Sequence, residues 1–271
     1  MLDKLLKAVA PVAGIAFASA VSGCNSNMDI KIGDVDGVPL AELDMSGDPP
    51  TSLVLAAPVQ VVIRNGKTLK IIPEGDGDVI DRLRFSNQGG QLGIGMENGN
   101  WTSNERTIIN VTMPAPKSLT VAGSGSIEAA SLEGEADANL LGSGSLAIKS
   151  IKASTLNVTI AASGSIKGAG TAEKLDLDIL GSGGAQMAEL SVETADVDVM
   201  GSGSAAFASD GTVKANIMGS GSVRVIGRAD CEVQSMGSGS LKCEAPAETA
   251  AKKASKTKSA KKKAAPKKRK G

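Results

Sequence analysis

The sequence predicts an all-β fold in which short strands stack as the coils of a parallel β-helix (a solenoid), with 18–20 residues per coil. Three observations lead to this prediction. A Gly-Ser-Gly-Ser motif recurs at nearly constant spacing, the segments between its copies alternate between apolar and polar residues, and the composition is rich in glycine. There are 33 glycines, and the only aromatic residues are Phe17, Phe85, Trp101 and Phe207, so a core must be built from aliphatic and small side chains.

The Gly-Ser-Gly-Ser motif marks one structural unit per repeat. Successive copies begin 19, 20, 19, 20, 18 and 18 residues apart. Glycine suits the corner of a coil because it accepts positive φ and lets neighbouring coils approach closely, and stacked serine hydroxyls can satisfy corner amides. The motif is complete at 123–126, 142–145, 201–204, 219–222 and 237–240, and it is degenerate at 162–165 and 181–184.

Two or three short strands joined by corners are predicted in each unit, including one before and one after the motif. In the segment before the motif, the first, third and fifth places are mostly apolar and the second and fourth are polar. This period of two is typical of a strand with one buried and one exposed face. Patterned strands of this kind argue against a flexible Gly-Ser linker, and the variable spacing argues against a left-handed hexapeptide helix. The aligned segments are 136–141, 156–161, 175–180, 195–200, 213–218 and 231–236.

The first half of the chain is also predicted to consist of short strands, broken by Gly, Asn, Asp and Pro. Asn65-Gly66 lies between two of them and indicates a hairpin or turn. No convincing amphipathic helix is present in the body of the chain. The candidate strands are 28–32, 39–44, 52–56, 60–64, 68–72, 82–85, 91–96 and 107–113.

The chain resembles the head GIN domain of bacterial envelope proteins, a family described as autotransporter-adhesin-like. The resemblance is carried by the strand-rich stretch 52–120, with Val-Gln-Val-Val-Ile-Arg-Asn-Gly at 59–66, and by Leu-Thr-Val-Ala-Gly-Ser-Gly-Ser at 119–126 with the repeats that follow. It covers about residues 38–245 and implies a right-handed β-helix, usually behind a lipoprotein or secretion signal. The family has no established catalytic residues to transfer.

Residues 1–23 are predicted to be an export signal. Lys4 and Lys7 precede a short apolar run at 8–20, which is too short to span a bilayer. The run ends in Val-Ser-Gly-Cys, which resembles a bacterial lipobox and makes Cys24 the predicted site of lipidation and of membrane attachment. Ordinary cleavage after the Ala-Ser-Ala at 18–20 is the alternative. Residues 24–37 then form a tether.

The three cysteines support this assignment, since one lipidated residue leaves a pair. Cys231 and Cys243 fall in apolar columns of the last repeats, so both are expected to point inward. In an oxidising compartment, a disulfide between them would close the end of the solenoid. Two free buried thiols are the alternative.

Four aspartates fall in adjacent polar columns of adjacent coils, so the sequence predicts an acidic outer face. A solvated acidic surface is the first interpretation of this pattern, and a calcium site is the alternative because hard oxygen ligands suit calcium. The absence of histidine excludes Ser-His-Asp and Cys-His catalysis and histidine ligation of metals, and no cofactor is predicted. The four residues are Asp176, Asp178, Asp196 and Asp198.

The zero net charge hides a basic tail on an acidic body. All 29 acidic residues lie at or before Glu248, whereas 11 of the 29 basic residues lie within 252–270, so the two parts carry −11 and +11. Residues 246–271 are predicted to be disordered, with possible partners in anionic lipid, polysaccharide or extracellular nucleic acid. A tail that only increases solubility is the alternative. The basic residues are Lys252, Lys253, Lys256, Lys258, Lys261, Lys262, Lys263, Lys267, Lys268, Arg269 and Lys270.

These features together predict a non-enzymatic envelope lipoprotein of the periplasm or outer membrane, acting as an adhesin-like, scaffolding or binding module. The alternative is a β-helix that binds or cleaves polysaccharide through its acidic wall. The lack of aromatic sugar platforms and of histidine favours the first.

Overall fold

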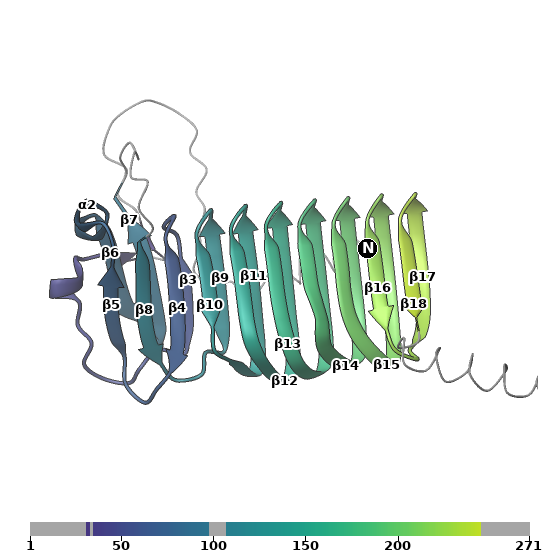
Figure 1. The fold of residues 1–271 in the computed structure, drawn as a ribbon, viewed down its shortest axis with the longest axis horizontal. Coiled ribbons are helices and arrows are strands. Elements are labelled where there is room, and N and C mark those ends of the chain that lie inside the picture. Colours follow the sequence, from purple (N-terminus) through teal and green to yellow (C-terminus); the bar gives the residue numbers. More distant parts are fainter. Residues whose placement is uncertain (1–30, 33–34, 98–106, 245–271) are drawn as a thin grey trace, which may run out of the picture.

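The computed structural model describes residues 31–32, 35–97 and 107–244 (Figure 1). The predicted signal at 1–23, Cys24 and the tail at 246–271 lie outside the described residues. Beside one 3-10 helix, η1 (Leu40–Glu42), and one short helix, α2 (Gly77–Asp81), the regular elements are strands. They are β1 (Lys31–Ile32), β2 (Val35–Asp36), β3 (Ser52–Leu55), β4 (Gln60–Asn65), β5 (Lys70–Glu74), β6 (Leu83–Gln88), β7 (Gln91–Met96), β8 (Ile108–Met113), β9 (Ser118–Gly123), β10 (Ser126–Ala129), β11 (Leu132–Gly142), β12 (Ser145–Ala162), β13 (Ser165–Gly181), β14 (Gly184–Gly201), β15 (Ser204–Gly219), β16 (Ser222–Ile226), β17 (Asp230–Gly237) and β18 (Ser240–Glu244).

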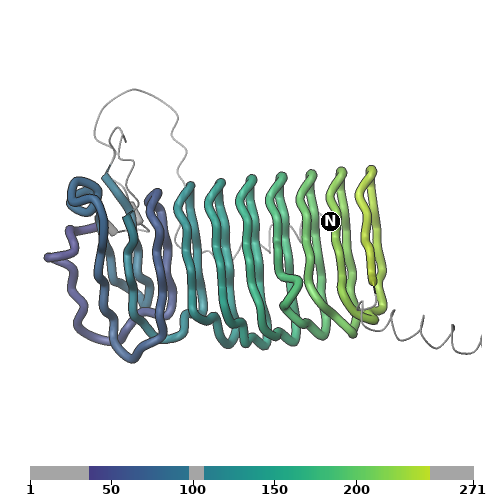
Figure 2. Tube along the Cα trace, in the orientation of Figure 1, coloured from purple at the N-terminus to yellow at the C-terminus, as the bar shows by residue number. Residues whose placement is uncertain are grey.

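The fold is a flattened β-solenoid of about seven turns, as the repeats predicted. Each coil has two arms, joined at one side by the Gly-Ser corner and at the other by a bend, and β12 to β15 run through the bend without a break (Figures 1 and 2). In Figure 1 the arms that leave the corners, such as β10 and β16, run downward in front of the arms that return upward, so the winding is right-handed.

The stacked arms form two sheets that enclose the core between them. The front sheet contains β8, β4, β10, the first arms of β12 to β15, β16 and β18. The back sheet contains β7, β3, β9, β11, the second arms of β12 to β15, and β17. Neighbouring strands within these two sets are parallel, and parallel stacking places equivalent residues of successive coils about 4.8 Å apart.

The corners keep the coils in register. The last residue of the motif forms one unbroken column, from Ser126 through Ser145, Ser165, Gly184, Ser204 and Ser222 to Ser240. Differences in coil length are absorbed at the bends, where the register shifts, for example between Ile148 and Ile151 and between Met187 and Ser191. The 18–20-residue spacing therefore reflects a fixed corner and a variable bend.

Steric constraints explain why both places of the corner are occupied by glycine. The first has positive φ, for example 117° at Gly181, and Ala162 is the only described residue other than glycine with positive φ, at 108°. The second lies against the coil before it, since a Cβ at Gly183 would stand 2.8 Å from the carbonyl oxygen of Gly164. Side chains are therefore excluded from the second place and strained at the first.

The core consists of columns of aliphatic side chains, as the alternation predicted. Ala136, Leu156, Leu175, Ala195 and Val213 follow one another in register, and each is at most 3% exposed. The side chains between them in sequence point outward. Alternation therefore determines which face of each arm is buried.

The N-terminal end is covered by antiparallel strands and does not follow chain order. β7 and β8 form the outermost coil, although β3 and β4, which precede them in sequence, lie between them and β9 and β10. β6 pairs antiparallel with β7 through a hairpin at Gly89-Gly90, where φ is 60° and 76°, as a type I′ turn requires. β5 pairs antiparallel with β8.

The C-terminal end has no such cover among the described residues. β17 pairs with β15 and β18 with β16, and Val233, in an inward column, remains 46% exposed. A disulfide joins Cys231 to Cys243, with a Cα–Cα distance of 6.8 Å, and connects the two arms of this last coil. Both cysteines occupy the expected inward columns, since Cys231 pairs in register with Val213 and Cys243 with Val225. Cys243 is nevertheless exposed, because no further described coil covers it.

Several local predictions differ from the structure. The strand expected at 39–44 is replaced by η1, in which the Glu42 amide donates to the Pro39 carbonyl. Asn65-Gly66 does not form a hairpin, because β4 and β5 pair with opposite edges of β8. α2 was not predicted, although Asp76 caps it by accepting a hydrogen bond from the Asp78 amide. Within the described ranges, no helix has the length and apolar character needed to cross a membrane.

Candidate binding face on the back sheet

The outer surface of the back sheet carries the four aspartates for which the repeat pattern predicted an acidic face. The register pairs Asp176 with Asp196 and Asp178 with Asp198, so the four carboxylates occupy two columns on two adjacent coils. Each pair is separated by one strand spacing, about 4.8 Å between backbones.

The four aspartates differ in their surroundings. Lys174 Nζ lies 2.8 Å from Asp176 Oδ2, and Asn216 donates a 2.8 Å hydrogen bond to Asp198. Burial raises the pKa of Asp178, and the neighbouring charges of Asp198 and Asp176 raise it further. The face therefore contains a partly buried carboxyl group that is harder to ionise than an ordinary aspartate.

The aspartates do not form a metal cluster. In the part of the chain that the structure describes, no group of three or more His, Cys, Asp or Glu side chains is close enough to hold a metal ion. Calcium prefers six to eight oxygen ligands. The pairs are better described as parts of long polar columns.

An exposed apolar column lies beside the polar ones, and the sequence interpretation did not include it. The residue before each corner points outward, and these residues pair in register along the solenoid. Leu180, Met218 and Met236 are 37%, 47% and 71% exposed. The sequence contained a signal for this column. In the six-residue segment before each motif, a Leu, Ala or Met at the sixth place breaks the alternation of apolar and polar residues. The apolar column consists of Ala122, Leu141, Ala161, Leu180, Met200, Met218 and Met236.

The two outer faces differ in charge. The back face carries eight carboxylates and two lysines, whereas the central column of the front face carries one carboxylate and three cations. The back-face charges are Glu135, Asp137, Lys174, Asp176, Asp178, Asp196, Asp198, Lys214, Asp230 and Glu232. The charges of this central front column are Glu128, Lys167, Arg224 and Lys242, and Glu244, two residues after Lys242 on β18, forms ion pairs with Arg224 and Lys242.

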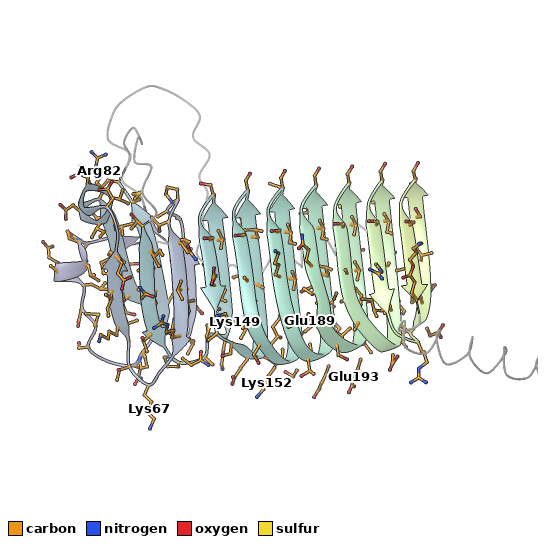
Figure 3. All side chains as sticks on the ribbon, in the orientation of Figure 1. Lys67, Arg82, Lys149, Lys152, Glu189 and Glu193 are labelled. Carbon is orange, nitrogen blue, oxygen red and sulfur yellow. A yellow bond between two sulfur atoms is a disulfide. The ribbon has the colours of Figure 1, made fainter. Side chains whose placement is uncertain are left out.

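Charges at the bends are mixed in sign and form no comparable surface. Lys149 and Lys152 of β12, and Glu189 and Glu193 of β14, lie along the bend side of the solenoid, two coils apart (Figure 3). Both of these cations lie on β12, and both of these carboxylates lie on β14, so among the four residues each sign is confined to one coil of this side.

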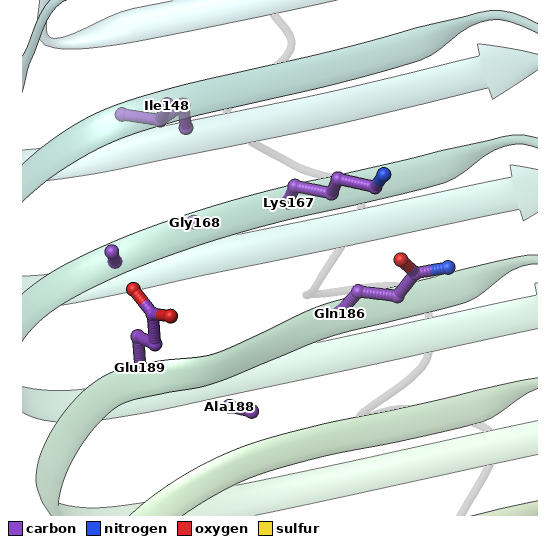
Figure 4. A pocket seen from close by; sticks show the side chains of 7 residues that line it. Ile148, Lys167, Gly168, Gln186, Ala188 and Glu189 are labelled. Carbon is purple, nitrogen blue, oxygen red and sulfur yellow. The ribbon is translucent and has the colours of Figure 1, made fainter.

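A small open pocket of about 270 Å³ lies on the front side, near the bend. Its floor is exposed because Gly168 and Ala169 are small, and Lys167, Gln186 and Glu189 stand around it (Figure 4). Lys167 and Gln186 point in the same direction, away from Glu189 (Figure 4). This volume is slightly below the usual range for small-molecule sites, so the pocket is a weaker candidate than the back face.

The remaining predicted site residues lie outside the described ranges. These are Cys24 and the basic residues of the tail, Lys252, Lys253, Lys256, Lys258, Lys261, Lys262, Lys263, Lys267, Lys268, Arg269 and Lys270.

The fold defines the class of protein as a right-handed parallel β-solenoid closed at its N-terminal end by antiparallel strands. The chain belongs to the family described as "Putative auto-transporter adhesin, head GIN domain", whose model matches residues 49–229. This agrees with the resemblance seen in the sequence. No curated protein matches the chain.

Solved structures with the same fold include proteins from Bacteroides and Parabacteroides species of low sequence identity. A putative adhesin from Bacteroides fragilis is 16% identical, with a TM-score of 0.65, covering 73% of this chain and 93% of that one. A putative lipid binding protein from Parabacteroides distasonis is 21% identical, with a TM-score of 0.58, covering 72% and 93%. A putative adhesin from Parabacteroides merdae is 20% identical, with a TM-score of 0.56, covering 72% and 92%. At these identities the likeness establishes the fold alone.

Proposed function

We propose that this protein is an exported, lipid-anchored and non-enzymatic binding module of the bacterial envelope, adhesin-like in the sense of its family. The family description and the adhesin or lipid-binding names of the structural neighbours support this class. The observation that carries the proposal is the back face, where an exposed apolar column runs beside polar columns over several coils. The repeat of about 4.8 Å suits an extended, repetitive ligand such as a polysaccharide or a polymeric surface.

The ligand face is tested by removing its apolar component. A Met218→Ser, Met236→Ser double variant should bind intact cells and immobilised polysaccharides more weakly than the wild-type protein, because both side chains are exposed and neither supports the core. Ile72→Ser is the matched control, since Ile72 is 42% exposed and lies on β5, away from the back sheet. Equal binding by both variants and the wild type would exclude this face.

The lipid anchor at Cys24 is proposed from the sequence alone. Its test is metabolic labelling with a fatty acid, comparing wild type with Cys24→Ala, followed by surface protease accessibility. Label that remains in the variant would reject Cys24, and release of the unlabelled variant from membranes would support attachment in the periplasm or outer membrane.

Cleavage of polysaccharide is a second candidate, favoured by one observation. Asp178 has a raised pKa and stands beside Asp198, and paired carboxyl groups of different acidity are used in glycoside hydrolysis. The expected result under this candidate is release of reducing ends from a polysaccharide, lost in Asp178→Asn with binding retained. Under the leading proposal no product forms.

The tail is proposed to contact anionic surfaces. Its 11 basic residues predict binding to anionic vesicles or nucleic acid that falls steeply with salt. Binding that does not change between low and high salt would contradict an electrostatic role for the tail.

A further inference from the structure

The apolar column of the back sheet contains three large exposed side chains in its C-terminal half. Leu180, Met218 and Met236 are 37%, 47% and 71% exposed, whereas Met200, between Leu180 and Met218, is half-buried. Met236 belongs to the last described coil, and no further described coil covers it. Large apolar side chains exposed in a row are unusual on an isolated soluble surface and indicate that something covers them.

The columns next to the apolar column are acidic and only partly compensated. Asp178 and Asp198 lie two residues before Leu180 and Met200 on their strands, on the same face. Mutual repulsion is part of the reason that the pKa of Asp178 is raised. A covering segment with apolar stems and positive heads would both shield the methionines and relieve this repulsion.

The chain itself carries a segment of this chemistry. Residues 252–270 hold 11 basic residues among alanines, serines, one threonine and one proline. Their charge of +11 equals in magnitude the net charge of −11 of the rest of the chain. Glu244 ends β18, the front arm of the last coil, and seven residues, 245–251, lie between it and Lys252. The eight residue steps from Glu244 to Lys252 reach about 26 Å when extended, whereas Asp196 and Asp198 lie two coils, or about 10 Å along the axis, from the last coil.

We propose that the basic tail, residues 252–270, docks on the back face of the same molecule. Lysine stems lie along Leu180, Met200, Met218 and Met236, and their ammonium groups stand among the aspartates. The front face does not compete, because its central column carries three cations, Lys167, Arg224 and Lys242, and the nearby carboxylate of Glu244 already pairs with two of them. Charge complementarity thus selects one face of the solenoid.

Docking of this kind makes the back face and the tail mutually dependent. A tail that lies on the face blocks a ligand of that face, and a polyanion that captures the tail uncovers the face. The two binding activities are therefore linked in one equilibrium. Contacts between exposed charges are individually weak and screened by salt, so docking is expected at low ionic strength and lost at about 0.5 M salt, where the screening length is only a few ångströms.

The first experiment measures tail accessibility in the full chain. Trypsin cleavage of the tail is compared between wild type and a variant with Asp176, Asp178, Asp196 and Asp198 all changed to Asn. At low salt the wild-type tail should be cleaved roughly three- to tenfold more slowly, as expected if it is docked 70–90% of the time. At high salt the two rates should be equal. Glu128→Gln, which removes a carboxylate from the front face, is the control and should behave as wild type.

The second experiment measures affinity for inorganic polyphosphate, which binds only the free tail. The Asn variant should bind it roughly three- to tenfold more tightly than wild type at low salt, since less of the tail is occupied. Equal cleavage rates and equal affinities at low salt would overturn the proposal. So would carbodiimide cross-links joining tail lysines to aspartates of a second molecule, because docking is proposed within one chain. Thermal melts establish that each variant still folds cooperatively.

Discussion

Ala162 offers a sharp test of how the corners hold the solenoid together. It stands at the first place of a degenerate motif, and its φ of 108° is adopted elsewhere at this place by glycines only, such as Gly142 and Gly181. A strained residue of this kind costs of order 1–3 kcal/mol. Replacement by glycine removes this strain but increases the entropy of the unfolded chain, which costs about 0.5–1 kcal/mol. Ala162→Gly should therefore stabilise the protein by about 1 kcal/mol.

The measurement is a thermal melt followed by circular dichroism. A gain of about 1 kcal/mol corresponds to an increase in Tm of about 2–4 °C for a domain of this size. Ala161→Gly is the matched control, because Ala161 is the preceding residue and is not among those with positive φ. In Ala161→Gly no strain is relieved, and only the larger entropy of the unfolded chain changes stability, so Tm should fall by about as much as it rises in Ala162→Gly. If both variants lower Tm equally, the corner does not strain Ala162 and the steric account of the motif is wrong.

Three further predictions concern the corner, the acidic face and the last coil. Gly201→Ala should lower the free energy of unfolding by at least about 1–3 kcal/mol in denaturant titrations, because φ is 124° and the new Cβ would collide with the carbonyl of Gly181. The pKa of Asp178 is raised in the folded state, so its ionisation costs stability above the unfolded value of 3.8, and Asp178→Asn should raise Tm at pH 7 but not below pH 3.8. Joining Cys231 to Cys243 restricts a short loop, so Cys231→Ser with Cys243→Ser should cost about 3 kcal/mol and speed hydrogen exchange in β17 and β18. Reduction should increase the mass by about 2 Da, and an unchanged mass would show that the thiols are free.

The repeated half of the fold was predictable because its interactions are periodic. Once the corners are aligned, one column assignment places Leu156 and Cys231 inside and Asp176 outside, and the register agrees with each placement. The alternation also contained the apolar column, since Met218 and Met236 interrupt it. The sequence interpretation treated these residues only as the end of a strand.

The N-terminal half was less predictable because its pairing is not local. Asn65-Gly66 gives a valid turn signal, but a turn does not determine whether the two strands pair with each other or, as here, with opposite edges of β8. The insertion of β3 and β4 between the β7–β8 coil and β9–β10 likewise depends on contacts between distant segments. The local patterns did locate the strands themselves, since the predicted 60–64 and 91–96 match β4 and β7, and α2 had a readable signal in its capping Asp76.

The architecture separates what holds the rod together from what it presents to other molecules. Inward columns and corner glycines tolerate little change, because each contacts its equivalents in the coils on either side. Outward columns contribute one side chain per coil at a fixed spacing, so substitutions there alter the surface in steps of about 4.8 Å without altering the core. The apolar column and the paired aspartates are built in this variable layer. A solenoid can therefore acquire a new binding face through a few exposed substitutions, which is why we look for the proposed binding function on the back face and not in the corners.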